Sequence, residues 1–414
     1  MDGQKESEAD QPSVVKKTFR AFSHRDFRLM WMGSFTSTTG TWTQQIAQGW
    51  LVYEMTNDPF YLGLVGFLGS LPFILFTLIG GAVADRVDRR KQLLASQYVQ
   101  MSSAFILTGL VYFEVIALWH FLVLVFVVGT AQAFGGPAYQ ALLPNLVPRE
   151  DMPNAIAINS TQFNLARMVG PFLAGILLEH VGAVLCFAFN GLSFVAVIIT
   201  LNLIETSFKP QKTGRSVLAD VRHGLSYLFD RAALWQLSLL GFITAFCGIP
   251  LLTQLPVFAR DIFNGDAQTY SHMMTVSAAG SVTGALIYAY FSDMKRRGLV
   301  TLIIELFFSA ILVGFALSRL LPLSFVLLFL GGMSMLTLIA SINALIQLAV
   351  EDEMRGRVMS VFMLSFRGGM PVGDLATGWT ASRLSPATAL VINAGLLASA
   401  AAAFLVSRSQ IEKL

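Results

Sequence analysis

The chain has 414 residues, of which 55% are hydrophobic and only 13% are charged, and its mean hydropathy is +0.64. A soluble domain carries about 25% charged residues, so an ordinary soluble protein is excluded. At about 34 residues for each span and its loop, the length allows about twelve membrane crossings. The formal net charge is +3. The basic residues of the chain are spread in short clusters between apolar runs, which argues against a nucleic-acid partner.

The apolar segments predict an all-α integral membrane protein with twelve transmembrane helices. Nine segments of at least twenty residues lack Lys, Arg, Asp and Glu: 29–53, 59–84, 92–113, 115–148, 180–204, 232–259, 267–292, 320–350 and 384–407. Three more are long enough if an internal charge is accepted: 152–178, 298–318 and 358–382. Because lipid cannot satisfy unpaired backbone groups, these runs are expected to be helices.

The basic residues also predict the orientation. The N-tail, the C-tail and alternate loops hold 23 Lys and Arg, and the intervening loops hold 3. Positive loops stay in the cytoplasm, so both termini are expected there. A polar tail and a basic segment precede the first apolar run, which does not resemble a cleavable signal. We therefore expect a multi-pass protein of the cell (inner) membrane.

A long polar interruption divides the chain into two halves. The expected organisation is a cytoplasmic tail, a six-helix bundle, a cytoplasmic linker, a second six-helix bundle and a short tail, at 1–20, 21–204, 205–231, 232–407 and 408–414. In the linker, Val217, Leu218, Val221, Leu225 and Leu228 share one helical face, which predicts an amphipathic helix on the membrane surface. A disordered tether is the alternative.

The two halves repeat one another weakly. Asp85 and Asp293 occupy matching places and each precedes a basic cluster, and Arg167 with Pro171 matches Arg367 with Pro371. Two pseudo-symmetric six-helix bundles are typical of secondary transporters, which bind their substrate between the repeats near the bilayer midplane.

Several segments resemble a known family. GGAVADRVDRRK (80–91) is similar to the loop signature of the major facilitator superfamily, and ARMVGPFLAG (166–175) resembles the Gly-Pro motif in the fifth helix of its drug:proton antiporters. Residues 22–56 and 354–378 resemble the branch that contains enterobactin exporters and macrolide efflux proteins. The resemblance covers about residues 20 to 407. Asp88, where many members have Gly, departs from the signature, and so does Met294 in the second copy.

The resemblance implies a cytoplasmic gate. In the family, the Asp of the loop signature holds the gate shut against the start of the eleventh helix. The matching residues of this chain are Gly81, Asp85, Arg86, Arg89, Arg90, Asp293, Arg355 and Arg357. The alternative is that they only orient the loop.

Small residues four apart predict close helix packing. Gly170, Pro171 and Gly175 lie on the predicted fifth helix, and Gly280 and Gly284 lie on the eighth. The resemblance places both helices at the contact between the halves. Packing unrelated to transport direction is the alternative.

Charges within apolar segments are costly and therefore candidate functional groups. Arg167 shares a face with Asn164, whereas Arg367 and Asp374 lie seven apart on the eleventh helix. Either Arg could hold an anionic group of the substrate or pair with an acid. Arg367 and Asp374 are also candidates to couple proton movement to transport. Glu305, on the peripheral ninth helix, is interpreted as a structural carboxylate, with a proton carrier as the alternative.

Uncharged polar stripes are candidates to line a substrate cavity. They include Trp42, Gln44 and Gln48 on the first helix, Gln132 on the fourth, and Asn343 and Gln347 on the tenth. Because Phe and Met are interleaved with them, large amphipathic ligands fit this pattern better than a small ion does.

Three functions remain. The favoured one is a secondary transporter that exports drug-like or siderophore-like amphipathic molecules in exchange for protons, by alternating access. The second is a proton- or ion-coupled uptake symporter of the same fold. The third, a membrane enzyme or ATP-driven pump, lacks sequence support because no phosphate-binding loop or HExxH motif occurs and the five His and two Cys are scattered. We therefore expect no enzyme activity, cofactor or metal. The expected partners are a small-molecule substrate, protons and the bilayer, and the oligomeric state is left open.

Overall fold

The computed structural model describes residues 19–84, 86–206, 217–290, 296–406 and 411, and these are almost entirely helical. The first group of long helices comprises α2 (Arg25–Thr56), α3 (Pro59–Ala84), α4 (Arg89–Tyr112), α5 (Leu118–Leu142), α6 (Met152–His180) and α7 (Ala183–Leu203). Three short 3₁₀ helices lie among them: η1 (Arg20–Ser23), η2 (Leu143–Asn145) and η3 (Arg149–Asp151).

The second group begins with a broken helix. Its segments are α9 (Ala232–Gly248), α10 (Pro250–Thr253), α11 (Leu255–Val257) and the π-helical η4 (Phe258–Ile262). The continuous helices that follow are α12 (Ala267–Tyr290), α13 (Arg297–Leu317), α14 (Leu321–Ala349), α15 (Asp352–Arg383) and α16 (Pro386–Val406). Between the groups lies α8 (Val217–Phe229).

Seven helical segments of the described chain are long and apolar enough to cross a membrane by length and composition: those of α3, α5, α7, α9 to η4, α13, α14 and α16. The other long helices, α2, α4, α6, α12 and α15, carry more polar side chains. For example, α2 holds Gln44 and Gln48, and α15 holds Arg367 and Asp374. Hydropathy alone therefore identifies the more apolar helices and leaves out those that carry polar side chains.

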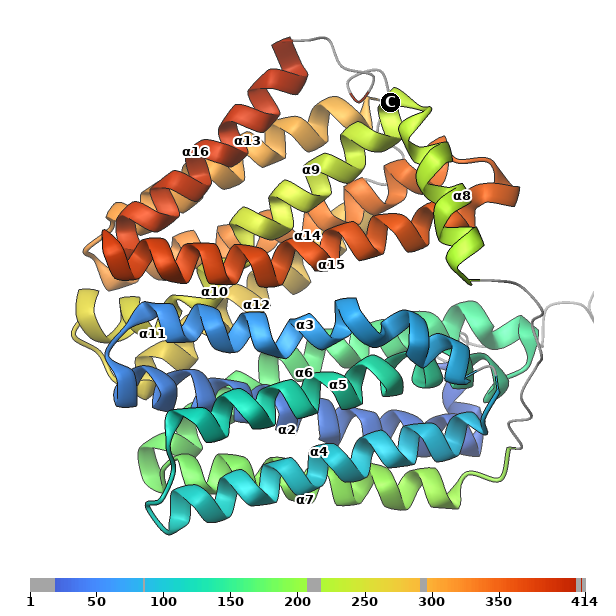
Figure 1. The fold of residues 1–414 in the computed structure, drawn as a ribbon, viewed down its shortest axis with the longest axis horizontal. Helices are drawn as coiled ribbons and strands as arrows, with labels where there is room; N and C mark the ends of the chain where they lie inside the picture. The colour runs from blue at the N-terminus through green and yellow to red at the C-terminus, as the bar shows by residue number, and fades with distance from the viewer. Residues whose placement is uncertain (1–18, 85, 207–216, 291–295, 407–410, 412–414) are drawn as a thin grey trace, which may run out of the picture.

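The two groups lie one above the other, with α3 beside α15 and α6 beside α12 (Figure 1). One side of the molecule holds the last residues of α3 and α7 and the first residues of α15, and we call it the linker end. The opposite side holds the last residues of α2 and α6, and we call it the distal end. In Figure 1 the linker end is on the right, near α8, and the distal end is on the left. The groups are closest on the left and lie further apart on the right.

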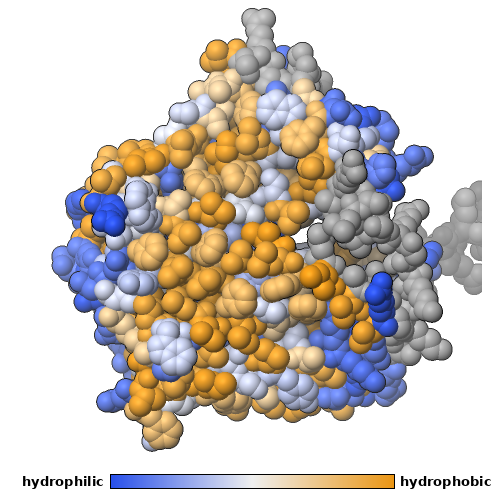
Figure 2. Space-filling view, viewed as in Figure 1, coloured by the Kyte–Doolittle hydropathy of each residue, from blue (hydrophilic) through white to orange (hydrophobic). Residues whose placement is uncertain are grey.

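The surface pattern fits a membrane protein. Figure 2 shows an apolar surface across the middle of the molecule and hydrophilic residues toward both ends. Large apolar side chains such as Leu75, Leu286 and Trp379 are exposed on the protein. An exposed apolar surface this extensive is not stable in water, so it fits a bilayer.

Glycines set the distance between α3 and α15. An added Cβ on Gly63 would lie 2.3 Å from the backbone oxygen of Asp374, and one on Gly378 would lie 3.0 Å from Cα of Gly63. A side chain at either position would force the backbones apart. Small residues permit this approach in lipid, where packing drives helix association.

The predicted amphipathic helix of the linker is helical, but its apolar residues do not share one environment. Leu228 is buried, whereas Leu225 is 43% exposed. Gly224 lies close to the backbone of Arg357, so α8 packs against the first turns of α15. Side chains 217–222 lie outside the described part. Leu228 belongs to the buried apolar cluster of the second group, together with Leu234 and Leu237 of α9.

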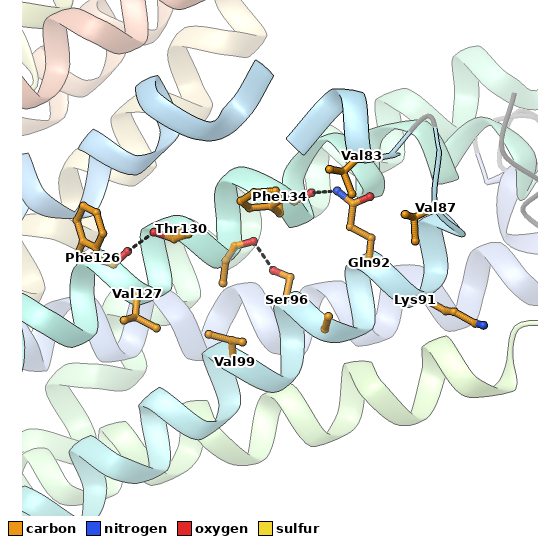
Figure 3. Close-up of a pocket in the computed structure, with 12 residues that line it drawn as sticks. Val83, Val87, Lys91, Gln92, Ser96, Val99, Phe126, Val127, Thr130 and Phe134 are labelled. Atoms are coloured by element: carbon orange, nitrogen blue, oxygen red, sulfur yellow. Dashed lines mark hydrogen bonds between the residues drawn. The ribbon is translucent and has the colours of Figure 1, made fainter. Parts of the chain in front are cut away.

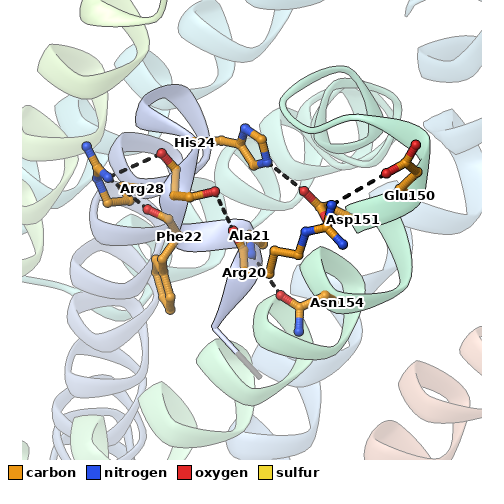
Figure 4. Close-up of polar contacts among 9 residues, drawn as sticks. Arg20, Ala21, Phe22, His24, Arg28, Glu150, Asp151 and Asn154 are labelled. Carbon is orange, nitrogen blue, oxygen red and sulfur yellow. Dashed lines mark hydrogen bonds and ion pairs between the residues drawn. The ribbon is translucent and has the colours of Figure 1, made fainter. Parts of the chain in front are cut away.

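A polar network ties η1 and the start of α2 to the linker end of the first group (Figure 4). His24 Nε2 lies 2.8 Å from Asp151 Oδ2, and Arg20 Nε lies 2.8 Å from Asp151 Oδ1. The backbone N–H of Ala21 donates to Asn154 at 2.9 Å. Asp151 is 3% exposed, so η1 is held firmly against the start of α6.

The close contact of α3 with α15 gives a testable prediction. Gly63→Ala should lower the stability by about 1–3 kcal/mol, because its methyl group overlaps a backbone oxygen of α15. The matched control is Gly81→Ala on the same helix, where an added Cβ meets nothing within 4 Å. That control should be neutral or slightly stabilising, since Ala favours helix by ~1 kcal/mol over Gly. Thermal unfolding in detergent measures both, and equal effects would contradict the packing.

Candidate functional site

A cavity of about 370 Å³ lies where the two groups meet. Residues of α2, α3, α4, α5 and α7 line it from the first group. Ile249, which follows α9, and residues of α10, α12 and α15 line it from the second. Its position at the boundary of two helix groups is typical of ligand sites.

The polar stripe predicted on α2 does line this cavity. Trp42, Gln44 and Gln48 all contribute to its wall. Asn190 of α7 also lines it and donates its amide N–H to Gln44 Oε1 at 2.7 Å. Asn190 was not among the residues predicted from the sequence, although an Asn within the apolar 180–204 segment was an available signal. Gln45, which follows Gln44 and also lines the cavity, was not predicted either.

A second amide pair also lines the cavity. Gln132, predicted on the fourth helix, donates to Gln100 Oε1 at 3.2 Å. Gln100 in turn donates to the hydroxyl of Ser96 at 3.1 Å. Gln100 was also missed, although it is an isolated amide in the apolar run 92–113. These pairs fix the amides so that they present defined hydrogen-bonding groups to a ligand.

Asp374 is the acid of the cavity. It is 5% exposed, and the hydroxyl of Thr253 donates to its Oδ1 at 2.7 Å. Its other carboxylate oxygen faces Gly66 of α3, where an added Cβ would lie 2.7 Å away. Among the lining residues that the structure describes, Asp374 is the one carboxylate, and none is Lys, Arg or His.

The break in the first helix of the second group places Thr253. Pro250 and Pro256 interrupt the helix, and Thr253 is the last residue of α10. The neighbouring Gln254 is fully buried, and its Oε1 has no hydrogen-bond partner. π-Helical segments such as η4, which follows, are frequent at functional sites. The two prolines within 232–259 were the available sequence signal for this break.

The two intramembrane arginines contact aromatic rings. The guanidinium carbon of Arg367 lies 4.0 Å from the ring centre of Phe73, and that of Arg167 lies 5.7 Å from the ring centre of Trp42. Cation–π contacts stabilise such charges. In this structure Asp374 bonds to Thr253 instead of pairing with Arg367. Neither arginine is among the described residues that line the cavity.

Glu305 lies away from the cavity, inside the second group. It is fully buried, and its carboxylate oxygens lie 2.9 and 3.1 Å from the hydroxyl of Thr244. That hydroxyl also lies 2.8 Å from the carbonyl oxygen of Leu240. A threonine has a single hydroxyl hydrogen. A protonated Glu305 that donates to Thr244, while Thr244 donates to Leu240, satisfies all three groups.

The polar residues predicted on the tenth helix do not line the central cavity. Asn343 Oδ1 accepts a hydrogen bond from Gln347 at 2.8 Å, and both line a separate cleft near the linker end. Asn164 donates to the backbone of its own helix, at Ser160. Asn343 and Gln347 therefore share a helix face as predicted, but that face lines the other cleft. Asn164 shares a helix with Arg167, but its side chain bonds to its own backbone.

The arginines of the predicted gate contact their own helix group here. Arg89 donates to the carbonyl oxygen of Ala141 at 3.2 Å, and Arg90 donates to that of Asn202 at 2.7 Å. Arg86 is exposed. Asp85 and Asp293 lie outside the described residues. At the start of α15, Arg355 pairs with Asp352 on the same helix, and Arg357 contacts the sulfur of Met354 at 3.5 Å.

The Gly-Pro motif of α6 has two neighbours. Gly170 packs on Trp42 of α2, within its own group, whereas Gly175 packs on Ser271 of α12. The hydroxyl of Ser271 donates to the carbonyl oxygen of Pro171. Gly280 and Gly284 instead pack on the backbone of α14. The implied contact between halves is therefore present at α6 but not at these two glycines.

Polar contacts also join the two groups at the distal end. The hydroxyl of Tyr53 donates to Asp261, and Gln268 donates to Glu179. Asp266, in the turn before α12, accepts the backbone N–H of Thr269 at 2.8 Å. That hydrogen bond lowers the pKa of the Asp266 carboxyl. The turns at this end are thus held together by several polar groups.

Comparison with known proteins decides the family. The model of the transmembrane secretion effectors, a major facilitator family, matches residues 16–413. The chain belongs to this family. It is 24% identical to macrolide efflux protein A of Streptococcus pyogenes over 86% of this chain and 90% of that protein. It is 26% identical to the staphyloferrin A transporter of Staphylococcus aureus over 83% and 86%.

A solved structure shares the fold. A bacterial homologue of the human lysosomal transporter Spinster, in an inward-facing and occupied conformation, superimposes with a TM-score of 0.74. It is 15% identical and the match covers 95% of this chain and 98% of that one. The family resemblance predicted from the sequence is confirmed. The chain is a multi-pass membrane transporter of the major facilitator type, with efflux proteins among its relatives, and not an enzyme.

The contacts of Glu305 give a second prediction. Thr244→Val removes the one polar partner described for a buried acid and should destabilise the protein by about 1–3 kcal/mol. Glu305→Gln should be tolerated, because an amide N–H can donate to Thr244 in the same way. Thr161→Val is the control, since Thr161 donates only to its own helix at Ala157. Thermal unfolding in detergent distinguishes the three, and a stable Thr244→Val would refute the assignment.

Proposed function

We propose that the protein exports amphipathic small molecules in exchange for protons, by alternating access in the cell (inner) membrane. The observation that carries this proposal is the cavity between the helix groups, which holds a single described carboxylate, Asp374. One negative charge can neutralise either a proton or the cationic group of a substrate, but not both. Competition for Asp374 would couple the two movements in opposite directions.

The wall of the cavity supports an amphipathic substrate. The amides of Gln44, Gln48 and Gln132 offer hydrogen bonds, while Trp42 and Met370 offer apolar contact. With no basic residue among the described lining residues, a neutral or cationic compound fits better than one with several carboxylates.

Alternating access is supported by the difference between the two ends. Tyr53 and Asp261, and Gln268 and Glu179, join the groups at the distal end, while the groups lie further apart at the linker end (Figure 1). We infer that closing the linker end would bring the loop signature, with Asp85, toward Arg355 and Arg357. Gly81, Arg86, Arg89, Arg90 and Asp293 belong to the same proposed gate. Contacts made in only one state shift the balance between states.

We also propose twelve transmembrane helices with both termini in the cytoplasm. The support is the 23 to 3 distribution of Lys and Arg and the six long helical stretches on each side of α8. The linker end would then face the cytoplasm. The bundles at 21–204 and 232–407, the linker at 205–231 and the two tails keep their predicted bounds.

Transport in proteoliposomes tests the function. The probe is tetraphenylphosphonium, an amphipathic cation whose charge does not change with pH, and the membrane potential is clamped. An acidic lumen should drive its accumulation, since protons leave as the probe enters. Asp374→Asn should lower this accumulation at least about tenfold, corresponding to ~1.4 kcal/mol or more of lost coupling.

Glu305→Gln is the matched control, because it neutralises a buried acid outside the cavity. It should retain proton-driven accumulation. Accumulation driven by an acidic exterior instead of an acidic lumen would establish the uptake symporter. Full coupling in Asp374→Asn would remove this carboxylate from the mechanism.

Thiol labelling tests the orientation. Both native cysteines are buried, so introduced ones report cleanly. Asn57→Cys and Gly265→Cys, at the distal end, should react with an impermeant reagent outside intact cells. Arg149→Cys, at the linker end, should react only after the membrane is opened. The reverse pattern would invert the proposed topology.

A further inference from the structure

A second cleft lies apart from the central cavity. It has a volume of about 660 Å³ and lies between α4 and α5, near the linker end. Val83 and Val87 border it where α3 passes into α4, and Val99, Phe126 and Val127 line it further along (Figure 3). Val99 and Val127 are 40% and 37% exposed, so this part of the cleft opens on the outer surface of the bundle.

The hydroxyl and amide groups inside this cleft already donate their hydrogen atoms to backbone carbonyl oxygens. Ser96 donates to the carbonyl oxygen of Ala131 at 2.6 Å, and Thr130 donates to that of Phe126 at 2.9 Å. The amide N–H groups of Gln92 donate to Gly80 at 3.0 Å and to Phe134 at 2.9 Å. The interior of the cleft therefore suits a hydrocarbon chain.

One hydrogen-bond acceptor in the cleft, the side-chain oxygen of Gln92, has no donor. Gln92 is 7% exposed, and its Oε1 is buried with no hydrogen-bond partner. A buried acceptor without a donor is unfavourable by about 1–3 kcal/mol in folded proteins. An occupant that carries a hydroxyl group could supply the missing donor.

The mouth of the cleft is positively charged. Lys91 lines it, and Arg86 lies in the adjoining turn; both are exposed, and neither forms an ion pair within the described part of the chain. The nearby Asp88 is engaged as the cap of α4, where it accepts the backbone N–H groups of Arg90 and Lys91. Segment 85–91 contains four basic and two acidic residues, so the mouth attracts an anion.

We propose that this cleft binds phosphatidylglycerol. The acyl chain would lie between α4 and α5, the phosphate would approach Lys91 and Arg86, and a hydroxyl of the glycerol headgroup would donate to Gln92. Basic pockets between transmembrane helices on the cytoplasmic side bind anionic lipid headgroups. The assignment does not depend on the substrate or the direction of transport.

Native mass spectrometry of the purified, delipidated protein tests this site, with phosphatidylglycerol and phosphatidylcholine of identical acyl chains as probes. Phosphatidylglycerol should bind the wild type more tightly. The double variant Arg86→Gln/Lys91→Gln should weaken its binding about 25-fold, from about fivefold for each positive charge removed near the membrane surface. Val127→Trp, which fills the cleft without changing charge, should weaken the binding of both lipids.

Arg149→Gln is the control for charge, because Arg149 is also exposed at the linker end but does not line the cleft. It should bind phosphatidylglycerol as the wild type does. Equal affinity of the wild type for the two lipids would overturn the headgroup assignment. Equal affinity of the double variant and the Arg149 control for phosphatidylglycerol, or no effect of Val127→Trp, would overturn the site.

Discussion

The close approach of α3 and α15 positions the proposed chemistry. Gly63 and Gly378 bring the two backbones into contact, and Gly66 leaves room for the carboxylate of Asp374. Because these helices belong to different halves of the chain, the acid lies at the boundary that alternating access must rearrange. The cavity, its amide-lined wall on α2 and the Thr253 contact are all arranged around this point. A larger residue at Gly63 would separate the acid from the wall that faces it.

The broken first helix of the second half links two buried acids. Thr244, before the break, contacts Glu305, and Thr253, after it, contacts Asp374. The two threonines are alike, but the acids differ in their surroundings. Glu305 is enclosed within one helix group, where its hydrogen bond with Thr244 stabilises the packing. Asp374 instead lines the central cavity. Burial of an acid is therefore not enough to assign a transport role; access to the cavity is also needed.

Charge is distributed unequally around the central cavity. The described cavity wall has amides and one carboxylate, while Arg167 and Arg367 contact the rings of Trp42 and Phe73 outside it. Basic residues are instead concentrated at the linker end, where Arg89 and Arg90 bind the last carbonyl groups of neighbouring helices. Helix C-termini carry partial negative charge, so these contacts are favourable. Lys91 and Arg86 are exposed at the same end and could contact an anionic lipid.

The sequence by itself determined the class of protein, the approximate helices, the family and several cavity residues. Gln44, Gln48, Gln132 and Asp374 were recognisable because polar groups in apolar helices are costly and seldom without purpose. Helical periodicity shows which side chains share a face, but not which neighbour that face meets. Asn343 and Gln347 shared a face that turned out to line another cleft, and Gly280 and Gly284 met α14 instead of the other half. Asn190 and Gln100 are amides in apolar segments and were recognisable in the same way. Thr253 became a candidate only in the tertiary structure, because its partner Asp374 lies 121 residues further along the chain.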